Sequence, residues 1–211
     1  MRQSHQVDSE QAAPVQVDCV MPAAGLSSRM GSRWKMMLPY RHHTILDESI
    51  ENALTFCSRV ILVTGHRSDE LVDRYRNKKG VKLIVNTHFK QGMFSSIQQG
   101  VEAVKTDHFF ISHGDMPCIS TDVYQRVWER GGNHTVFPGT LEKPGHPVLL
   151  PASLIEKIAA SPYDGKMKKI IFSGEVKFAE INSKGIHFDV DTPEAYDTLC
   201  HMSQSSYQNE S

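Results

Sequence analysis

Residues 17–31 read Val-Asp-Cys-Val-Met-Pro-Ala-Ala-Gly-Leu-Ser-Ser-Arg-Met-Gly, and Lys35 follows shortly afterwards. The apolar run 17–21 has the length and composition of a buried strand. The residues after it are small or polar, and they include glycine, so backbone N–H groups there can close around an anion. Hydroxyl donors and positive charges that suit phosphate oxygens follow in the same stretch: Ser27, Ser28, Arg29 and Lys35. The stretch therefore predicts a strand that leads into a phosphate-binding loop.

The glycine spacing in this loop excludes two better-known phosphate-binding motifs. Five residues separate Gly25 from Gly31, and no Gly-Lys-Ser or Gly-Lys-Thr follows, so the loop is not a P-loop. The dinucleotide-binding pattern G-x-G-x-x-G is absent as well. From composition alone, a purely structural strand-to-helix loop stays open as the alternative.

Beyond the loop, short apolar runs alternate with amphipathic stretches. Strands are expected at 17–21, 59–63, 82–85 and 108–112, with helices at 46–57, 69–77, 93–104 and 121–129. Such alternation implies right-handed crossovers and a mostly parallel sheet. After Gly132 the expected elements are shorter: strands at 135–137, 147–150, 177–180 and 186–190, and helices at 153–160, at 166–171 and from Pro193. The predicted fold class is α/β, a Rossmann-like, doubly wound, mostly parallel sheet with a small antiparallel insert.

Length and composition predict one domain over residues 17–200 with polar, disordered tails at 1–16 and 201–211. The formal net charge of −1 and a sequence pI of about 6.8 indicate no global basic surface for nucleic acid or an anionic membrane. No apolar stretch approaches a membrane span or a signal peptide. The four cysteines lack a metal-binding or C-x-x-C spacing, so buried, reduced thiols and a cytoplasmic location are expected.

Carboxylates stand after two of the predicted strands. Asp115 lies in His-Gly-Asp-Met-Pro, directly after the buried run that ends at Ser112. Asp189 and Asp191 are two residues apart on a predicted strand, which would place them on one face. Carboxylate oxygens beside a polyphosphate are ligands for Mg²⁺. The alternatives are a turn role for Asp115 and a helix-capping role for Asp191 or Thr192 ahead of Pro193.

The pattern A-A-G-x-S-x-R-M-G followed by Lys35 resembles the signature of nucleotidyltransferases that act on the molybdenum cofactor. They belong to a wider group with sugar-phosphate and methylerythritol-phosphate nucleotidyltransferases, of the nucleotide-diphospho-sugar transferase fold type. The resemblance covers most of the chain, from Cys19 to about Leu199. One departure is Pro22, where an aliphatic residue is common, because proline removes an N–H donor.

The resemblance implies a role for each matching residue. Arg29 and Lys35 would neutralise the triphosphate and, with Asp115, form the catalytic set; Asp115, Asp191 and, as a weaker candidate, Asp189 would hold Mg²⁺. The implied nucleotide-binding residues are Ala23, Ala24, Gly25, Leu26, Ser27, Arg29, Lys35, Gly65, Asn86, Gly92, Ser95 and Asp115. For Ser95 the structural alternative is a helix cap.

The cytidylyl-transferring branch is implied by Ala24-Gly25-Leu26 in place of A-G-G and by the Gly145-His146-Pro147 loop. The expected reaction is transfer of CMP from CTP to the terminal phosphate of molybdopterin or the molybdenum cofactor, with release of pyrophosphate. His146 is expected near the acceptor, and a structural role for it is the alternative. A recipient molybdoenzyme is a further implied partner. A transferase acting on a sugar or polyol phosphate, and a carrier of the molybdenum cofactor, are the alternative functions.

Overall fold

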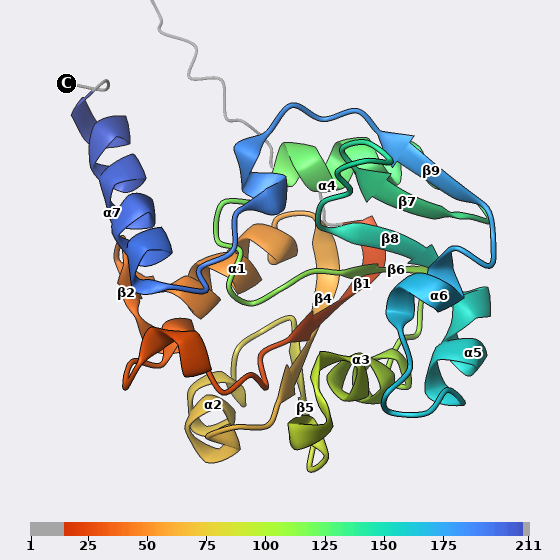
Figure 1. The fold of residues 1–211 in the computed structure, drawn as a ribbon, viewed down its shortest axis with the longest axis horizontal. Coiled ribbons are helices and arrows are strands. Elements are labelled where there is room, and N and C mark those ends of the chain that lie inside the picture. The colour runs from red at the N-terminus through yellow and green to blue at the C-terminus, as the bar shows by residue number, and fades with distance from the viewer. Residues whose placement is uncertain (1–14, 209–211) are drawn as a thin grey trace, which may run out of the picture.

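A seven-stranded sheet forms the centre of the computed structural model, which describes residues 15–208 (Figure 1). Its strand order is β5-β4-β1-β6-β8-β7-β9. β8 runs antiparallel to both of its neighbours, and every other neighbouring pair is parallel. The prediction of a mostly parallel sheet with an antiparallel element in its second half is confirmed. The strands are β1 (Val15–Pro22), β4 (Cys57–Thr64), β5 (Val81–Val85), β6 (His108–Ile111), β7 (Thr135–Pro138), β8 (Val148–Pro151) and β9 (Val176–Ala179).

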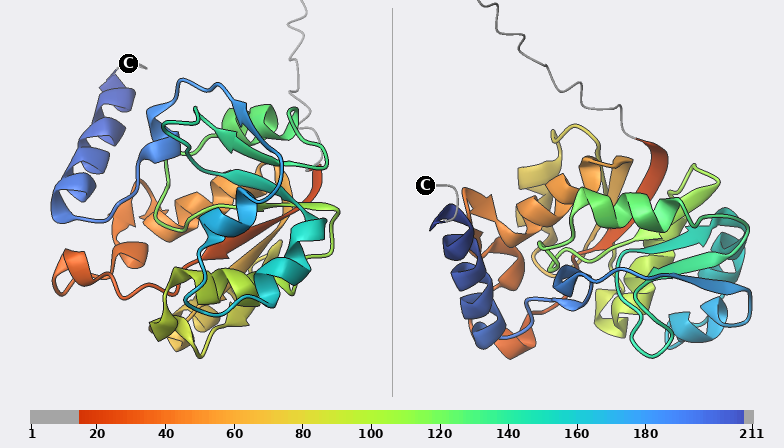
Figure 2. Two further views of the ribbon diagram at one scale, coloured as in Figure 1. Left: turned by 45° about the vertical axis from the view of Figure 1, so that its right-hand side comes forward. Right: turned by 90° about the horizontal axis from the view of Figure 1, so that it is seen from above.

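Helices cover both faces of this sheet, as Figure 2 shows from two further sides. Apolar side chains of α1, α2 and α4 share one buried cluster, and those of α3, α5 and α6 share the other. The sheet is therefore doubly wound, as predicted, and its ligand site is expected at the carboxyl ends of the strands. The helices are α1 (Ile45–Leu54), α2 (Ser68–Tyr75), α3 (Met93–Val101), α4 (Thr121–Trp128), α5 (Ile155–Ala159), α6 (Met167–Ile171) and α7 (Pro193–Gln208).

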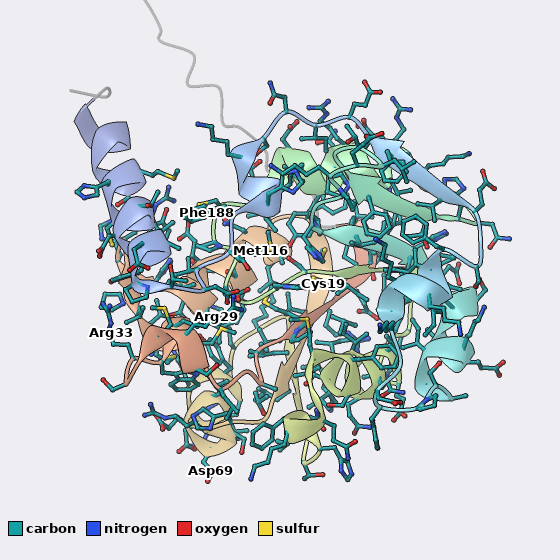
Figure 3. The ribbon with its side chains drawn as sticks, in the orientation of Figure 1. Cys19, Arg29, Arg33, Asp69, Met116 and Phe188 are labelled. Carbon is teal, nitrogen blue, oxygen red and sulfur yellow. The ribbon has the colours of Figure 1, made fainter. Side chains whose placement is uncertain are left out.

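Strand β1 lies inside the sheet, between β4 and β6, and its side chains divide between the two faces. Cys19 and Met21 belong to the cluster under α1, whereas Val20 belongs to the cluster under α3. Figure 3 shows Cys19 deep among the packed side chains. The one acidic residue of the strand, Asp18, is 2% exposed and accepts two hydrogen bonds from the Arg59 guanidinium, at 2.8 and 2.7 Å. This pairing allows a charge to remain in a central strand.

The cysteines carry no disulfide in the structure: Cys19 and Cys57 are buried, and Cys118 and Cys200 are partly buried, all as free thiols. Within residues 15–208, no helix is both long and apolar enough to cross a bilayer.

The two chain ends differ from the predicted tails. β1 begins at Val15, and residues 1–14 of the predicted N-terminal tail lie outside the described residues. The predicted tail from His201 is wrong as far as Gln208, because α7 continues to that residue; 209–211 lie outside the described part. Leu199 on this helix is buried beside Tyr40, so tertiary packing supports a helix that composition alone disfavours.

Two further differences concern short elements. A two-stranded antiparallel hairpin, β2 (Pro39–Tyr40) with β3 (His43–Thr44), precedes α1 and was not predicted. The strand expected at 186–190 is wrong: the structure has a 3₁₀ helix at Lys184–His187 and irregular backbone after it. β9 already forms the edge of the sheet, and the following segment crosses back over the strand ends instead. There, the Val190 N–H donates to the Asp115 carbonyl at 3.0 Å.

Helix α3 approaches the sheet closely at Gly100. A Cβ atom there would lie 2.5 Å from Val20 Cγ1 and 2.9 Å from Val63 Cγ2, both on buried strand residues. The missing side chain allows α3 to lie directly on β1 and β4. This close packing places the N-terminal end of α3, at Met93, beside the carboxyl ends of the two strands.

We predict that Gly100→Ala destabilises the protein. Helix propensity alone would favour alanine by about 1 kcal/mol, but the new methyl group overlaps two buried valines. Overpacking of this kind costs roughly 1–3 kcal/mol and outweighs the propensity gain. Urea unfolding measures the difference. Gly174→Ala is the matched control, since the nearest atom to a Cβ there is 3.8 Å away; equal free energies of unfolding for both variants would contradict the prediction.

Candidate active site

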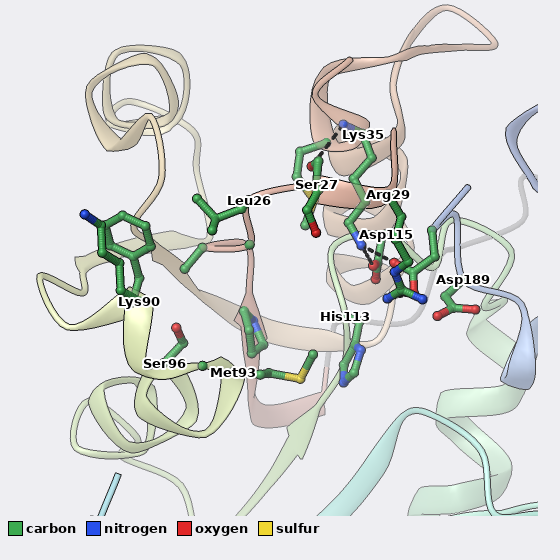
Figure 4. Close-up of a pocket in the computed structure, with 18 residues that line it drawn as sticks. Leu26, Ser27, Arg29, Lys35, Lys90, Met93, Ser96, His113, Asp115 and Asp189 are labelled. Carbon is green, nitrogen blue, oxygen red and sulfur yellow. Dashed lines mark hydrogen bonds and ion pairs between the residues drawn. The ribbon is translucent and has the colours of Figure 1, made fainter. Parts of the chain in front are cut away.

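A pocket of about 570 Å³ opens beyond the carboxyl ends of β1 and β6, where a doubly wound sheet is expected to bind its ligand (Figure 4). Many of the residues expected from the sequence line it: Ala24, Gly25, Leu26, Ser27, Arg29, Lys35, Gly92, Asp115, Asp189 and Asp191. The predicted convergence of the first loop, the loop after β6 and the segment before α7 is therefore present.

The first loop wraps one side of the pocket. Ser27 adopts a left-handed backbone conformation, with φ of 53°, and a short 3₁₀ turn follows at Ser28–Met30. The Ser27 hydroxyl accepts a hydrogen bond from the Lys35 backbone N–H at 3.3 Å. A non-glycine residue in this conformation is strained, and such strain concentrates at functional sites. Ala23 is different from its neighbours: it is fully buried, and its N–H donates to Val63, so it supports the loop from below.

The Lys35 ammonium joins the two predicted carboxylates. Its Nζ donates to Asp115 and, at 2.6 Å, to Asp191 Oδ1. Burial by itself lowers the pKa of Lys35, but the charges and hydrogen bonds of the two carboxylates outweigh it and raise that pKa. The ammonium therefore stays charged at neutral pH.

Two more charges complete this side of the pocket. The Arg29 guanidinium, two-thirds exposed, forms an ion pair with Asp191. Burial of Asp191 opposes its ionisation, but the hydrogen bond and charge of Lys35 hold its pKa below the usual range. Burial and the neighbouring Asp191 charge raise the pKa of Asp189. Two cations and three carboxylates thus line one wall, and Figure 4 shows Arg29, Lys35, Asp115 and Asp189 grouped there.

The carboxylates of Asp115 and Asp191 are hard oxygen ligands of the kind that bind a divalent cation. Both contact the Lys35 ammonium, so they converge on one position that carries a positive charge. In residues 15–208, no group of three or more His, Cys, Asp and Glu side chains has the arrangement to hold a metal ion by itself. Binding through two carboxylates together with substrate phosphates is the usual arrangement for Mg²⁺. The donor set therefore fits such an ion once a polyphosphate is present.

The opposite wall of the pocket comes from the loop after β5 and the start of α3. Asn86 and Ser95, predicted to approach the nucleotide, are fully buried and bonded to each other, with Asn86 Nδ2 donating to Ser95 Oγ at 2.9 Å. Asn86 Nδ2 also donates to Ser96 Oγ at 3.0 Å. Ser96, not Ser95, lines the pocket. Ser95 does not cap α3 either, because its hydroxyl donates to the Gly92 carbonyl at 2.8 Å.

Two histidines meet on the side of β6 and β8. The rings of His113, which lines the pocket, and His146 lie 4.1 Å apart between centroids. Burial, with a contribution from Lys35, lowers the pKa of His113 to about 4; burial, with the neighbouring His113, lowers the pKa of His146 to about 3. Both rings are therefore neutral at pH 7. His146 stands behind His113, and its buried Nδ1 has no hydrogen-bond partner in the described region.

Ser28, expected as a hydroxyl donor of the first loop, also lines the pocket, whereas several lining residues were missed by sequence reasoning: Pro22, Met36, Phe89, Lys90, Met93, Ser96 and His113. Most are immediate neighbours of residues that were singled out, so the segments were recognised and the orientation of single side chains was not. Gly65 was singled out but does not line the pocket; a Cβ atom there would lie 2.8 Å from Ala24 Cβ.

Thr192 caps α7, as the sequence suggested, since its hydroxyl accepts a hydrogen bond from the Ala195 N–H at 3.2 Å.

The fold and this pocket define a nucleotide-binding α/β domain with paired charges for a polyphosphate. Its sequence matches the MobA-like NTP transferase domain over residues 19–177. The chain belongs to this family of nucleotidyltransferases.

Three known proteins are similar to the chain in sequence or in structure. The chain is 42% identical to the molybdenum cofactor cytidylyltransferase of Escherichia coli, over 86% of this chain and 94% of that protein. It is 30% identical to the nicotine blue oxidoreductase of Paenarthrobacter nicotinovorans, over 67% of this chain and 74% of that protein. A nucleotidyl transferase structure from Methanothermobacter superposes with a TM-score of 0.80 at 20% identity, over 90% of this chain and 99% of that one. The last comparison shows the shared fold.

We predict that Lys35→Met destabilises the protein at pH 7 by about 3 kcal/mol, because it removes the cation partner of the buried Asp115 and one of the two cation partners of Asp191. A carboxyl group with a lowered pKa stabilises the fold above its unfolded pKa, about 3.9, and loses that effect as the pH falls. The difference from wild type should therefore be fully present at pH 7 and smaller at about pH 3, below that unfolded pKa.

Urea unfolding at the two pH values measures this change. Lys90→Met, at an exposed pocket lysine, serves as the control for the loss of one positive charge. A deficit for Lys35→Met that stays constant between the two pH values would contradict an electrostatic origin.

Proposed function

We propose that this chain transfers CMP from CTP to the terminal phosphate of molybdopterin or the molybdenum cofactor, and releases pyrophosphate. The observation that carries the proposal is the 42% identity to a molybdenum cofactor cytidylyltransferase across 94% of that protein. The identity to a protein named for an oxidoreductase reaction is lower and covers less of both chains. The grouping of Arg29, Lys35 and Asp115 on one wall of the pocket supports nucleotidyl transfer in particular.

The transfer needs little covalent chemistry from the protein. An oxygen of the acceptor phosphate attacks the α-phosphorus of CTP in line, and the bond from that phosphorus to the pyrophosphate oxygen breaks. The acceptor monoester has a second pKa near 6, so it is already largely ionised at neutral pH and no general base is required. Lys35 and Arg29 neutralise the triphosphate and position it, which is how proteins accelerate phosphoryl transfer.

The proposal includes Mg²⁺ as the metal ion, with Asp115 and Asp191 as its protein ligands. When bound, such an ion would neutralise phosphate charge, including the negative charge that develops on the leaving pyrophosphate. The raised pKa of Asp189 makes it the less suitable ligand of the three carboxylates. Lys35 and Arg29 both contact Asp191, so in this proposal part of their bonding to carboxylate would be exchanged for bonding to phosphate.

Cytosine recognition is proposed for the wall that holds Leu26 and Ser96. Both residues line the pocket away from the charged wall, and the Ser96 hydroxyl is oriented by Asn86. Asn86 and Ser95 would then support this wall from behind without touching the base. Gly65 would allow the first loop at Ala24 and the loop at Phe89 to approach each other. The Ala24-Gly25-Leu26 sequence and the Gly145-His146-Pro147 loop resemble the cytidylyl-transferring branch.

The acceptor is proposed to lie on the side of His113, with His146 supporting that ring. The proposal also includes a cytoplasmic location and delivery of the product to a molybdoenzyme. A transferase for a sugar or polyol phosphate and a non-catalytic cofactor carrier are the alternatives. Against a pure carrier stands the complete set of charged residues that triphosphate chemistry needs.

We predict that the purified protein releases pyrophosphate from CTP, and not from ATP, GTP or UTP, when Mg²⁺ and molybdenum cofactor are supplied. Asp115→Asn should lower kcat by roughly 10²–10³, the loss typical of one preorganised charge partner. Asp122→Asn, at an acidic residue on the outer surface of α4, is the matched control and should keep wild-type turnover.

Other outcomes of this screen point to specific errors. Turnover with GTP would refute the assignment of cytosine. Activity with CTP and a sugar phosphate, but not with the cofactor, would favour the first alternative. Tight binding of the cofactor without pyrophosphate release from any NTP would favour the carrier.

A further inference from the structure

Lys35 follows a short exposed stretch of the first loop that is held at both ends by buried side chains. Met30 is 2% exposed and Trp34 is 8% exposed, whereas residues 31–33 between them are exposed. Figure 3 shows Arg33 at the periphery of the molecule. The Trp34 carbonyl accepts the Met37 N–H at 3.0 Å and so begins the 3₁₀ turn that carries Lys35. The position of Trp34 therefore sets the start of that turn.

The Trp34 indole does not line the pocket; it lies against the turn between β4 and α2. The Arg67 guanidinium carbon is 4.5 Å from the centroid of the Trp34 ring, within the range of a cation–π contact. The His66 ring meets the same indole edge-on, with centroids 6.4 Å apart and planes at 82°. Two consecutive residues of one turn thus hold the side chain that precedes Lys35.

This turn is also held in place by contacts that do not involve Trp34. Arg67 has a left-handed backbone, with φ of 52°, and its guanidinium donates two hydrogen bonds to Glu70, one of them 2.7 Å long. The His66 N–H donates to the Ala24 carbonyl at 3.3 Å, which ties the turn to the first loop. Gly65 allows that approach, since any Cβ atom there would meet Phe89 and Ala24 within 2.8 Å. The turn is therefore a preformed support.

We propose that Trp34, held by Arg67, is a positioning residue that sets where the Lys35 ammonium meets the nucleotide triphosphate. The inference rests on the proposed function, in which Lys35 contacts the triphosphate. A lysine side chain is long and flexible, so the location of its backbone decides where the ammonium can reach. Displacement of a positioned group by about 1 Å can cost on the order of 10² in rate. Trp34 does not line the pocket, so in this proposal it acts only through Lys35.

The test compares two substitutions at Trp34 with one at its contact partner Arg67. Trp34→Ala should lower kcat by roughly 10- to 100-fold and weaken CTP binding, while Trp34→Phe, which keeps a ring in the slot, should restore most of both. Arg67→Met should cost roughly 2- to 5-fold, the range of a partly exposed cation–π contact. Arg76→Met is the matched control, because this exposed arginine at the end of α2 is paired only with Asp73, at 3.6 Å, among the ion pairs of the described region. It should match the wild type.

Double variants separate positioning from a general loss of structure. In a Lys35→Met background, Trp34→Ala should cause no further loss of kcat, because the group that it positions is already gone. Multiplying losses in that double variant would overturn the proposal, as would unchanged kcat in Trp34→Ala. Thermal unfolding of each variant identifies any that fails to fold. If Trp34→Ala does not fold, Arg67→Met takes its place and is compared with and without Lys35→Met. Losses of kcat that multiply in that double variant would again overturn the proposal.

A second readout keeps this inference distinct from the proposed function. CTP binding measured by calorimetry with Mg²⁺, without any acceptor, needs no turnover. If the wild type binds CTP but releases no pyrophosphate, the proposed reaction fails, and the same double-variant comparison of dissociation constants still tests Trp34. Fold changes in the dissociation constant that multiply in the double variant would then overturn the positioning role.

Discussion

The ammonium of Lys35 between the carboxylates of Asp115 and Asp191 is the interaction on which the pocket depends. It joins the first loop to two distant segments. Asp115, in the loop after β6, is 80 residues from Lys35 in sequence, and Asp191, in the segment before α7, is 156 residues away. Without that positive charge, two carboxylates that are less than one-fifth exposed would face each other. The backbone bond from Val190 to the Asp115 carbonyl holds the same two segments together, so charge and backbone reinforce one geometry. A site arranged in this way is ready to exchange one set of charge partners for another.

Around this centre, most supporting residues act from behind the pocket wall. Asn86 orients Ser96, and Trp34 anchors the turn that carries Lys35. Neutral His146 stands behind neutral His113, which leaves the charged wall as the region suited to phosphates and the histidine side suited to other polar groups. Division of a pocket into a charged and an uncharged part fits a reaction in which both substrates carry phosphate but differ in their remaining chemistry.

Much of the fold followed from local patterns. The strands at 59–63 and 82–85 were predicted because buried parallel strands appear as short apolar runs, and they extend by only a few residues in β4 and β5. The prediction of a strand at 186–190 was wrong because the apolar residues there pack in an irregular crossing segment. Periodicity cannot distinguish such a segment from an edge strand. The helix after His201 was missed because its polar residues give no pattern, and packing near Leu199 supports it instead.

The sequence by itself determined which charged and small residues the candidate site contains. Glycine and small residues after the first strand, with Arg29 and Lys35, predict an anion-binding loop, and carboxylates after later strands supply the opposite charges. Tertiary structure alone decided which neighbour in each segment reaches the pocket. Ser96 rather than Ser95 lies on the wall, and His113 rather than His146 faces the cavity, since the orientation of α3 and of the loop against β6 sets these directions. Residue type is a local property, whereas side-chain direction follows from packing between segments distant in sequence.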